Sequence, residues 1–314
     1  MPMTRRRALA LTAAVAAVPH IASAQANEPV TVHVGTQPAE FSADLFYGID
    51  TGIFQRAGLS IDLQMLANGA QTSAAIVAGA LNLGLADPLS VALAQQRGLD
   101  LVFIAPGCGF AMPWPLAWVT RADAGIVTAK DFNGKTIGTN GIKNAPSLMA
   151  LYWIDHNGGD SQSVKWVEIP FSTAIGAIQE KRIDGELMAE PFLSQAREAG
   201  MHVTGLDHNT SATRWMVNGW VASRAWANAN PALVKRFVAA MYESNHWGNT
   251  HTVETYPIIA KYTKLPEAVI PGMVKHPWIE QLSAPLVQPV LDTATRYGVL
   301  TKFVAATDLF YAGH

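Results

Sequence analysis

Hydrophobic and polar residues alternate along this chain with two different periods. Short runs such as 30–35 (VTVHVG) repeat every second residue, as strands do, whereas longer runs repeat every third or fourth residue, as helices do. Strand-like and helix-like runs alternate between residues 30 and 106. The pattern predicts strands at 30–35, 60–66, 81–86 and 99–106, separated by helices at 42–58, 71–80 and 88–98.

The same alternation starts again at residue 135, after a polar loop. It predicts strands at 135–140, 164–170, 185–189 and 201–206, with helices at 145–159, 172–182 and 191–200. Two more amphipathic helices, at 231–248 and 284–300, are expected to pack on the outside of a lobe. Strands and helices that alternate with short connections are typical of a parallel sheet covered by helices. The chain is therefore predicted to be an α/β protein with two lobes.

The first 24 residues fit neither series. Three arginines at 5–7 precede an uncharged apolar stretch that ends in Ala-Ser-Ala at 22–24, which is the pattern of an export signal. Pro19 interrupts the stretch, which is shorter than the roughly 18 to 20 residues needed to span a bilayer. We expect residues 1–24 to be removed after export by the twin-arginine or the general secretory route, leaving a soluble periplasmic protein.

Composition and charge narrow the possible functions. Apolar residues make up 49% of the chain and charged residues 15%, which is enough for a large core. Removing the three signal arginines takes Lys and Arg from 22 to 19 against 24 Asp and Glu, so the formal net charge changes from −2 to −5. An acidic chain has no electrostatic support for nucleic-acid binding. A single cysteine, Cys108, excludes an internal disulfide.

Two turns of similar sequence follow predicted strands. LADPLSVAL at 85–93 and MAEPFLSQA at 188–196 each place a carboxylate before a proline and a helix. Loops that follow parallel strands gather at one edge of the sheet, where ligands bind. Asp87 is expected chiefly to cap its helix, with direct ligand contact as the alternative. Glu190 has a longer side chain that suits capping less, so we expect it to reach a ligand or the opposite lobe.

An ordered set of segments resembles the substrate-binding proteins of ABC importers. The set begins with GIDTGIFQRAGLSIDLQMLANGAQTSAAIVAGALNLGLADP and continues with LVFIAPG, DFNGKTIGTNG, IDGELMAEPF and NPALVKRFVAAMYE. It is most similar to the group for nitrate, alkanesulfonates, taurine and thiamine-precursor pyrimidines, which is called the NMT1/THI5-like or SsuA-like group. The likeness extends from about Val30 to the C-terminus.

This resemblance implies a type II periplasmic-binding-protein fold, in which two α/β lobes with a double crossover hinge enclose a ligand cleft. By analogy, residues 27–118 and 218–314 form lobe I, and residues 119–217 form lobe II. We expect a monomer without a cofactor or bound metal that delivers a small molecule to an ABC permease in the inner membrane and does not itself insert. The ligand classes are sulfonates, carboxylates, and amines or pyrimidines; Glu190 favours an amine or a flat polar ring.

Polar and aromatic residues after the predicted strands are the candidate ligand contacts. Helix N-termini among them can hold an anion or an acceptor oxygen with their N–H groups. The structural alternatives are an Asn-Gly turn at 68–69, simple capping near 144–147 and a buried Trp215. Histidines at 33, 202 and 276 lack ligand spacing and are expected to be structural or exposed. The candidates are Gln37, Phe41, Asn68, Ala70, Gln71, Asp87, Asn140, Asn144, Ser147, Phe171, Glu190 and Trp215.

Catalytic motifs are missing from the sequence. It contains no G-x-S-x-G elbow, no H-E-x-x-H, no paired-cysteine metal site and no P-loop. Eukaryotic pyrimidine synthases for thiamine share the implied fold, but they carry a cysteine-rich motif where GCGF at 107–110 has one cysteine. We therefore expect a binding protein and not an enzyme. A sensory binding protein that signals to a membrane receptor is a third hypothesis.

Overall fold

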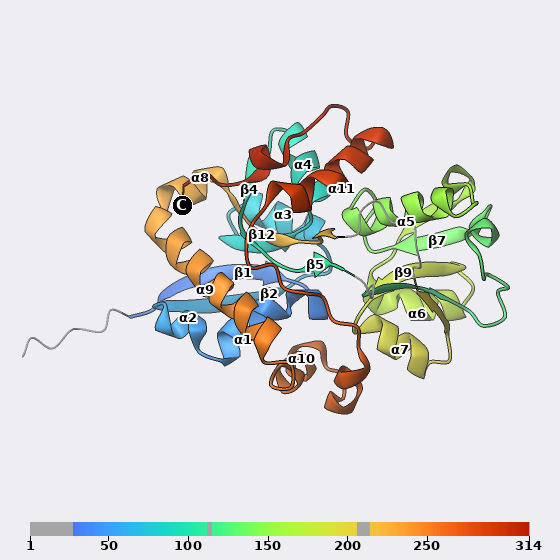
Figure 1. Cartoon of the computed structure of the whole chain (residues 1–314), viewed down its shortest axis with the longest axis horizontal. Coiled ribbons are helices and arrows are strands. Elements are labelled where there is room, and N and C mark those ends of the chain that lie inside the picture. The colour runs from blue at the N-terminus through green and yellow to red at the C-terminus, as the bar shows by residue number, and fades with distance from the viewer. Residues whose placement is uncertain (1–27, 112–114, 206–213, 314) are drawn as a thin grey trace, which may run out of the picture.

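The computed structural model describes residues 28–111, 115–205 and 214–313, so the expected export signal at 1–24 lies outside the described residues. Figure 1 shows two lobes side by side. The two ends of the chain, in blue and in orange to red, form the first lobe, and the green and yellow middle forms the second. Each lobe contains one five-stranded sheet.

The sheet of the first lobe has the strand order β2-β1-β3-β12-β4. β1 pairs in parallel with β2 and β3, whereas β12 lies antiparallel between β3 and β4. β3 and β4 are buried along their whole length, which explains their continuous apolar sequences. The strands are β1 (Val30–Thr36), β2 (Leu59–Met65), β3 (Leu83–Ala86), β4 (Leu101–Pro106) and β12 (Gly219–Ser223).

The sheet of the second lobe has the order β10-β6-β9-β7-β8. β7 is parallel to β8 and β9, whereas β6 is antiparallel to both β9 and β10. A separate antiparallel pair, β5 with β11, lies where the chain passes between the lobes. These strands are β5 (Gly109–Phe110), β6 (Leu116–Thr120), β7 (Thr136–Thr139), β8 (Lys165–Glu168), β9 (Gly185–Ala189), β10 (His202–Gly205) and β11 (Trp215–Met216).

The prediction of two parallel sheets is wrong, because both sheets are mixed. The chain leaves the first lobe after β4 and returns to it before β12. The first strand that follows each crossing, β6 or β12, enters its new sheet antiparallel to its neighbours. The lobe boundary expected at 118/119 falls inside β6, and the boundary expected at 217/218 falls just before β12.

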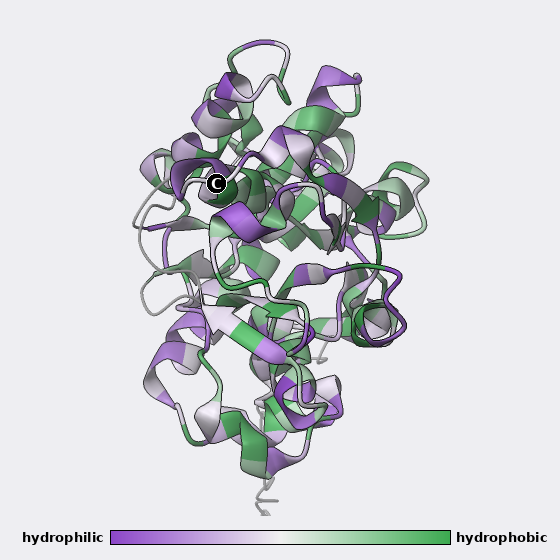
Figure 2. Ribbon diagram, turned by 90° about the vertical axis from the view of Figure 1, so that its right-hand side faces the viewer, coloured by the Kyte–Doolittle hydropathy of each residue, from purple (hydrophilic) through white to green (hydrophobic). Residues whose placement is uncertain are grey.

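Helices cover both sheets, and most of them carry hydrophobic and hydrophilic residues side by side (Figure 2). The helix expected at 42–58 is divided at Gly52, whose φ of +74° lies in the left-handed region that glycine tolerates. The α-helices are α1 (Ala43–Asp50), α2 (Ile53–Arg56), α3 (Gly69–Val77), α4 (Pro88–Gln96), α5 (Ala145–His156), α6 (Phe171–Gln179), α7 (Phe192–Glu198), α8 (Arg224–Ala229), α9 (Pro231–Thr250), α10 (Thr255–Thr263) and α11 (Ala284–Arg296). Short 3-10 helices are η1 (Glu40–Ser42), η2 (Ala129–Phe132), η3 (Ser161–Ser163), η4 (Glu267–Gly272) and η5 (Ala306–Leu309).

Aromatic side chains fill the core of each lobe. In the first lobe, Phe237 of α9 stacks on Phe54 with ring centroids 5.5 Å apart and meets Trp220 of β12 edge to face. In the second lobe, Trp118 of β6 packs against Phe132, 4.4 Å away between centroids. Burial of such rings supplies much of the stability of a domain. Within the described part of the chain, no helix combines the length and apolar character needed to cross a membrane.

Candidate functional site

A cavity of about 550 Å³, part of it open solvent, lies between the two lobes. The first lobe lines it with residues that follow β1, β2 and β3, and the second lobe with residues that follow β7 and β8 and with the end of β9. The two crossings between the lobes add Leu116, Val217 and Asn218. The lining residues are Gln37, Phe41, Gly69, Leu85, Ala86, Asp87, Leu116, Asn140, Asn144, Pro146, Phe171, Ala189, Val217, Asn218 and His276.

Half of the predicted contact residues line this cavity, namely Gln37, Phe41, Asp87, Asn140, Asn144 and Phe171. Contact with a ligand remains a prediction for each of them. Phe41 precedes α1 in the first lobe and Phe171 begins α6 in the second. The cavity therefore has an aromatic ring from each lobe in its walls.

The start of α3 is placed differently from the prediction. Only Gly69 of this segment lines the cavity, whereas Asn68, Ala70 and Gln71 do not. The Asn68 side chain accepts a hydrogen bond from the Gln71 N–H at 3.0 Å, and the Gln71 side chain accepts one from Ala67 N at 3.1 Å. These two side chains are used to cap the helix, which was the structural alternative for the Asn-Gly turn.

Asp87 joins the two lobes. Its Oδ1 accepts hydrogen bonds from Leu89 N and Ser90 N, both at 3.1 Å, and so caps α4 as predicted. The same oxygen accepts a hydrogen bond at 3.0 Å from Ala145 N, which begins α5 in the second lobe. Burial raises the pKa of the Asp87 carboxyl, although the bonds from Ser90 and Ala145 act in the opposite direction. One carboxylate thus serves the N-termini of two helices that belong to different lobes.

The N-terminus of α5 is fully occupied by such contacts. Asn144 Oδ1 accepts from Ser147 N at 2.9 Å, and Ser147 Oγ accepts from Asn144 N at 3.1 Å, which together form a capping box. Asn144 Nδ2 also donates to Asn140 Oδ1 at 3.0 Å. Ser147 lines a different cavity and not the cleft between the lobes.

The prediction that the Glu190 carboxylate points into the cleft is wrong. Its oxygens accept from Ser194 N at 2.9 Å and from Arg197 Nη1 at 2.9 Å, both inside the second lobe, and the side chain is buried. The reason is that α7 begins at Phe192, one residue later than the pattern predicts. The extra methylene of glutamate spans the added residue and lets Glu190 cap the helix. Its neighbour Ala189 lines the cavity instead.

Trp215 also lies outside the cavity. Its ring is almost completely buried and stacks on Phe110, with centroids 5.0 Å apart and planes 5° from parallel. Its Nε1 is buried and has no hydrogen-bond partner among the described residues. The buried-core alternative therefore holds for Trp215. Phe110 in turn meets His276 edge to face at 5.9 Å.

His276 lines the cavity although the sequence suggested only a structural or exposed role. Its Nδ1 lies 2.6 Å from Oε2 of Glu40, and its N–H donates to Oε1 of the same carboxylate at 3.2 Å. Both side chains are buried. Since a carboxylate only accepts, this pairing places a hydrogen on Nδ1 and leaves Nε2 without a bond to any described residue. The ring also lines a neighbouring cavity beside Tyr47.

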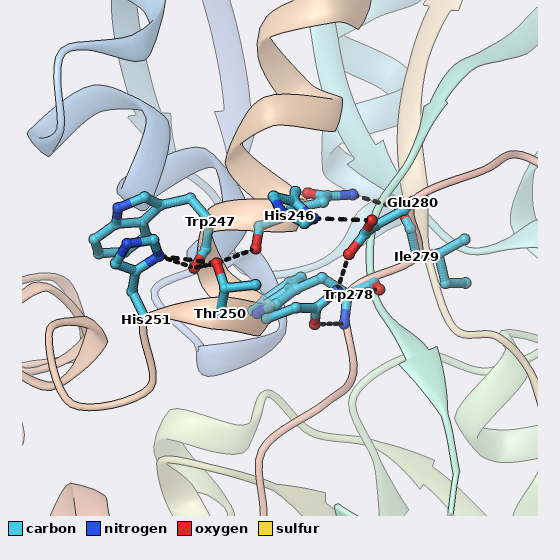
Figure 3. Close-up of polar contacts among 9 residues, drawn as sticks. His246, Trp247, Thr250, His251, Trp278, Ile279 and Glu280 are labelled. Atoms are coloured by element: carbon cyan, nitrogen blue, oxygen red, sulfur yellow. Dashed lines mark hydrogen bonds and ion pairs between the residues drawn. The ribbon is translucent and has the colours of Figure 1, made fainter.

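The end of α9 holds the segment that carries His276. Trp278 N donates to Asn249 Oδ1 at 3.0 Å, and Asn249 Nδ2 donates to Glu280 at 2.8 Å. His246, one turn earlier on the helix, lies 3.2 Å from the other oxygen of Glu280 (Figure 3). Two residues on one helix face thus fix an irregular segment, and with it the position of the imidazole.

Sequence reasoning missed His276 and Asn218. Neither follows a predicted strand of the two series, and the partner of His276 lies 236 positions away in the chain. Asn218 Oδ1 accepts from Cys108 N at 3.1 Å, and its Nδ2 donates to Phe41 O at 3.2 Å. Asn218 therefore ties the second crossing to the first lobe. The polar Asn218 in the otherwise mostly apolar return segment WMVNGWVAS is the feature of the sequence that could have indicated its role.

The single cysteine of the chain is not placed to act as a nucleophile. Cys108 is fully buried and does not line the cavity. Burial raises the pKa of its thiol well above the ordinary range, and the nearby carboxylates of Glu40 and Asp44 act in the same direction. Reactive cysteines need the opposite environment, partly exposed and electropositive.

The chain is similar to one protein family and to proteins that are described as binding proteins. The model of the family described as "NMT1/THI5 like" matches residues 41–252. A putative binding protein of Brucella abortus is 24% identical over 273 residues, which cover 85% of this chain and 81% of that protein. These relatives are described as binding proteins.

Two solved structures confirm the predicted fold. One is the ligand binding component of an ABC-type import system from Staphylococcus aureus, with a TM-score of 0.77 and 14% identity, covering 90% of this chain and 96% of that one. The other is the alkanesulfonate-binding protein SsuA from Xanthomonas axonopodis pv. citri bound to MOPS, with a TM-score of 0.74 and 19% identity, covering 90% and 99%. With a family model matching about two thirds of its length, the chain belongs to the NMT1/THI5-like family.

Proposed function

We propose that this protein is a periplasmic solute-binding protein that captures a small organic molecule between its lobes and delivers it to an ABC permease in the inner membrane. The observation that carries the proposal is the cavity itself, which is lined by the ends of strands from both lobes. A molecule held there touches both halves and therefore favours their closure. The family membership and the import component of similar fold support the same role.

Three contacts between the lobes are those expected of a closed state. Asp87 accepts from Ala145 N, Glu40 N donates to Glu190 O at 3.4 Å, and Tyr297 of the first lobe donates from its hydroxyl to Asp155 Oδ2 of α5 at 2.9 Å. Each such bond contributes about 0.5–1.5 kcal/mol. The ligand must add its own preference for the closed arrangement, because only differential affinity shifts the equilibrium.

A binding role is favoured over catalysis. The buried thiol of Cys108 cannot supply the cysteine chemistry of the related synthases, and the carboxylates near the cavity are bonded to N–H groups or to His276. The carboxylate of Glu190, which was expected to reach a ligand or the opposite lobe, is bonded within its own lobe. No observation favours a sensory role over transport, so transport alone is proposed.

A thermal-shift screen of the mature protein tests the proposal. The library contains sulfonates, carboxylates, and amines and pyrimidines. We expect at least one compound to raise the melting temperature, and small-angle scattering to show a smaller radius of gyration in its presence. A cell that lacks the protein is expected to lose uptake of the same compound, whereas a sensory protein would leave uptake intact.

A matched pair of variants assigns the effect to the cleft. A side chain added at Gly69 meets only Leu85 O and Ala86 Cα at 3.8 Å and then extends into the cavity, so Gly69→Leu should block binding without disturbing the fold. Gly176 lies in α6 with open space around it, and Gly176→Leu is the control. Ligand-induced stabilisation that survives Gly69→Leu would place the ligand elsewhere and reject the proposal.

A further inference from the structure

Among the described residues, the walls of the cavity between the lobes contain no lysine or arginine. Their ionisable residues are Asp87 and His276, and the partner of His276 is the carboxylate of Glu40. Lys275 lies next to His276 in the chain, but it lines the neighbouring cavity and its Nζ lies 4.4 Å from the centroid of the Tyr256 ring. Even with a protonated His276, the two carboxylates leave these groups with a net negative charge.

Two of the helix N-termini at the cavity, those of α4 and α5, are already used by Asp87. In α4, Pro88 has no N–H, and the next two N–H groups donate to Asp87 Oδ1. In α5, Ala145 N donates to Asp87, Pro146 has no N–H, and Ser147 N donates to Asn144. In these two helices, the first-turn N–H groups that bind anions in other proteins are thus taken by side chains of this chain, chiefly by the Asp87 carboxylate.

The site is built for the ionised form of Asp87. Three backbone N–H groups, those of Leu89, Ser90 and Ala145, donate to its Oδ1, and the Ser90 hydroxyl donates to its Oδ2. Three N–H donors at the N-termini of two helices favour the ionised form, whereas a protonated carboxyl would have to place its hydrogen on Ser90 Oγ. A ligand carboxylate or sulfonate would have to lie in the same cavity as this charge, without a lysine or arginine from the described lining residues to offset it.

Three polar groups in the walls have no hydrogen bond to a described residue. They are the side-chain amide of Gln37, Nδ2 of Asn140 and Nε2 of His276. An amide offers a donor and an acceptor, and neutral imidazole offers an acceptor at Nε2. Phe41 and Phe171 add a ring from each lobe, which suits a flat apolar body.

We propose that this cavity selects an uncharged ligand that has a flat apolar body and an amide-like pair of donor and acceptor groups, and that the Asp87 carboxylate excludes anions. The inference rests on the proposed function and narrows its ligand classes. It also separates this chain from the similar protein that is described as binding alkanesulfonates.

Isothermal titration calorimetry with five compounds of one size tests the inference. The compounds are benzamide, benzoate, benzenesulfonate, acetophenone, which only accepts, and benzylamine, which is cationic. We expect benzamide to bind at least tenfold more tightly than either anion and than acetophenone. An anion or benzylamine that binds as tightly as benzamide, or benzamide that does not bind, overturns the inference. If the protein closes around an anion, the proposed function stands and only the inference fails. If it closes around none of these five compounds and none of the thermal-shift library, the proposed function and the inference are both rejected.

Two variants test whether charge is the cause. Asp87→Asn keeps the shape and an acceptor oxygen, and it should raise the affinity for benzoate at least tenfold relative to the affinity for benzamide. The control is Asp62→Asn, which removes the same charge from an exposed carboxylate bonded to His33. Since loss of the cap can unfold the Asp87 variant, Gln37→Lys supplies a cation from a side chain without bonds to described residues. Benzoate affinity that neither variant raises overturns the inference.

Discussion

Glu186 makes the stability of the second lobe depend on pH in an unusual direction. It lies in β9 between Val119 of β6 and Gly138 of β7, and both of its carboxyl oxygens are buried without a hydrogen-bond partner among the described residues. A Cβ at Gly138 would lie 2.5 Å from one of these oxygens, so the glycine provides the space for the carboxyl. Burial alone raises the pKa of Glu186 well above its ordinary value.

The sign of the effect follows from this raised pKa. Folding favours the protonated carboxyl, so the free energy of unfolding should fall as pH rises from the unfolded pKa of about 4.3 through the higher folded pKa. Each unit by which the folded pKa exceeds the unfolded pKa lowers the free energy of unfolding by about 1.4 kcal/mol at high pH. Glu186→Gln removes the ionisation and should gain at least that amount at pH 8, with no gain of this kind at pH 4.

A second substitution separates charge from unsatisfied polarity. Glu186→Met has similar length and no polar atom to bury, so it should add a further gain of about 1–3 kcal/mol at either pH. Urea unfolding at pH 4 and pH 8, followed by circular dichroism, measures both variants. Glu198→Gln on the exposed end of α7 is the control. A Glu186→Gln protein that is less stable than the wild type at pH 8 would show that the carboxyl has a partner, and would refute the reasoning.

Three other changes have defined outcomes. Glu190→Ala removes the bonds to Ser194 N and Arg197, so it should lower the free energy of unfolding by about 1–2 kcal/mol in thermal unfolding. Calorimetry should show less than a threefold change in ligand affinity. A tenfold loss of affinity with intact stability would show that Glu190 does belong to the binding site. Tyr297→Phe removes the hydroxyl bond to Asp155 and should destabilise the closed state by about 0.5–1.5 kcal/mol. Small-angle scattering with ligand present should then show a larger radius of gyration. An unchanged radius would mean that this bond does not contribute to closure. Burial raises the pKa of Asp44 to about 7. Asp44→Asn removes this ionisation and keeps an acceptor for Trp220 Nε1, so it should increase the free energy of unfolding above pH 7 and not at pH 4. Equal effects at both pH values would contradict the raised pKa.

Local patterns in the sequence predicted the features that depend on neighbouring residues. The alternating periods located the strands and helices of the two predicted series, and Asp87 before Pro88 indicated a cap that the structure contains. Residues that follow strands, such as Gln37 and Asn140, line the cavity because the ends of β1 and β7 face each other across it. Each of these inferences needed only a short segment and the geometry of a parallel strand.

The remaining features depend on contacts between distant segments. The bond from Ala145 N to Asp87 joins residues 58 positions apart, and the Glu40–His276 pair joins residues 236 apart. A single sequence contains no periodic signal for either contact. Glu190 was misplaced for a different reason, since a shift of one residue in the start of α7 changes what its carboxylate can reach.

The position of β12 has a consequence for the order in which the lobes form. Residues 219–223 lie between β3 and β4, so these two strands have no shared neighbour until the chain has been synthesised past that point. The second sheet, in contrast, takes all five strands from residues 116–205 and needs nothing that comes later. Because distant pairing slows folding, the lobe that is begun first is the one completed last.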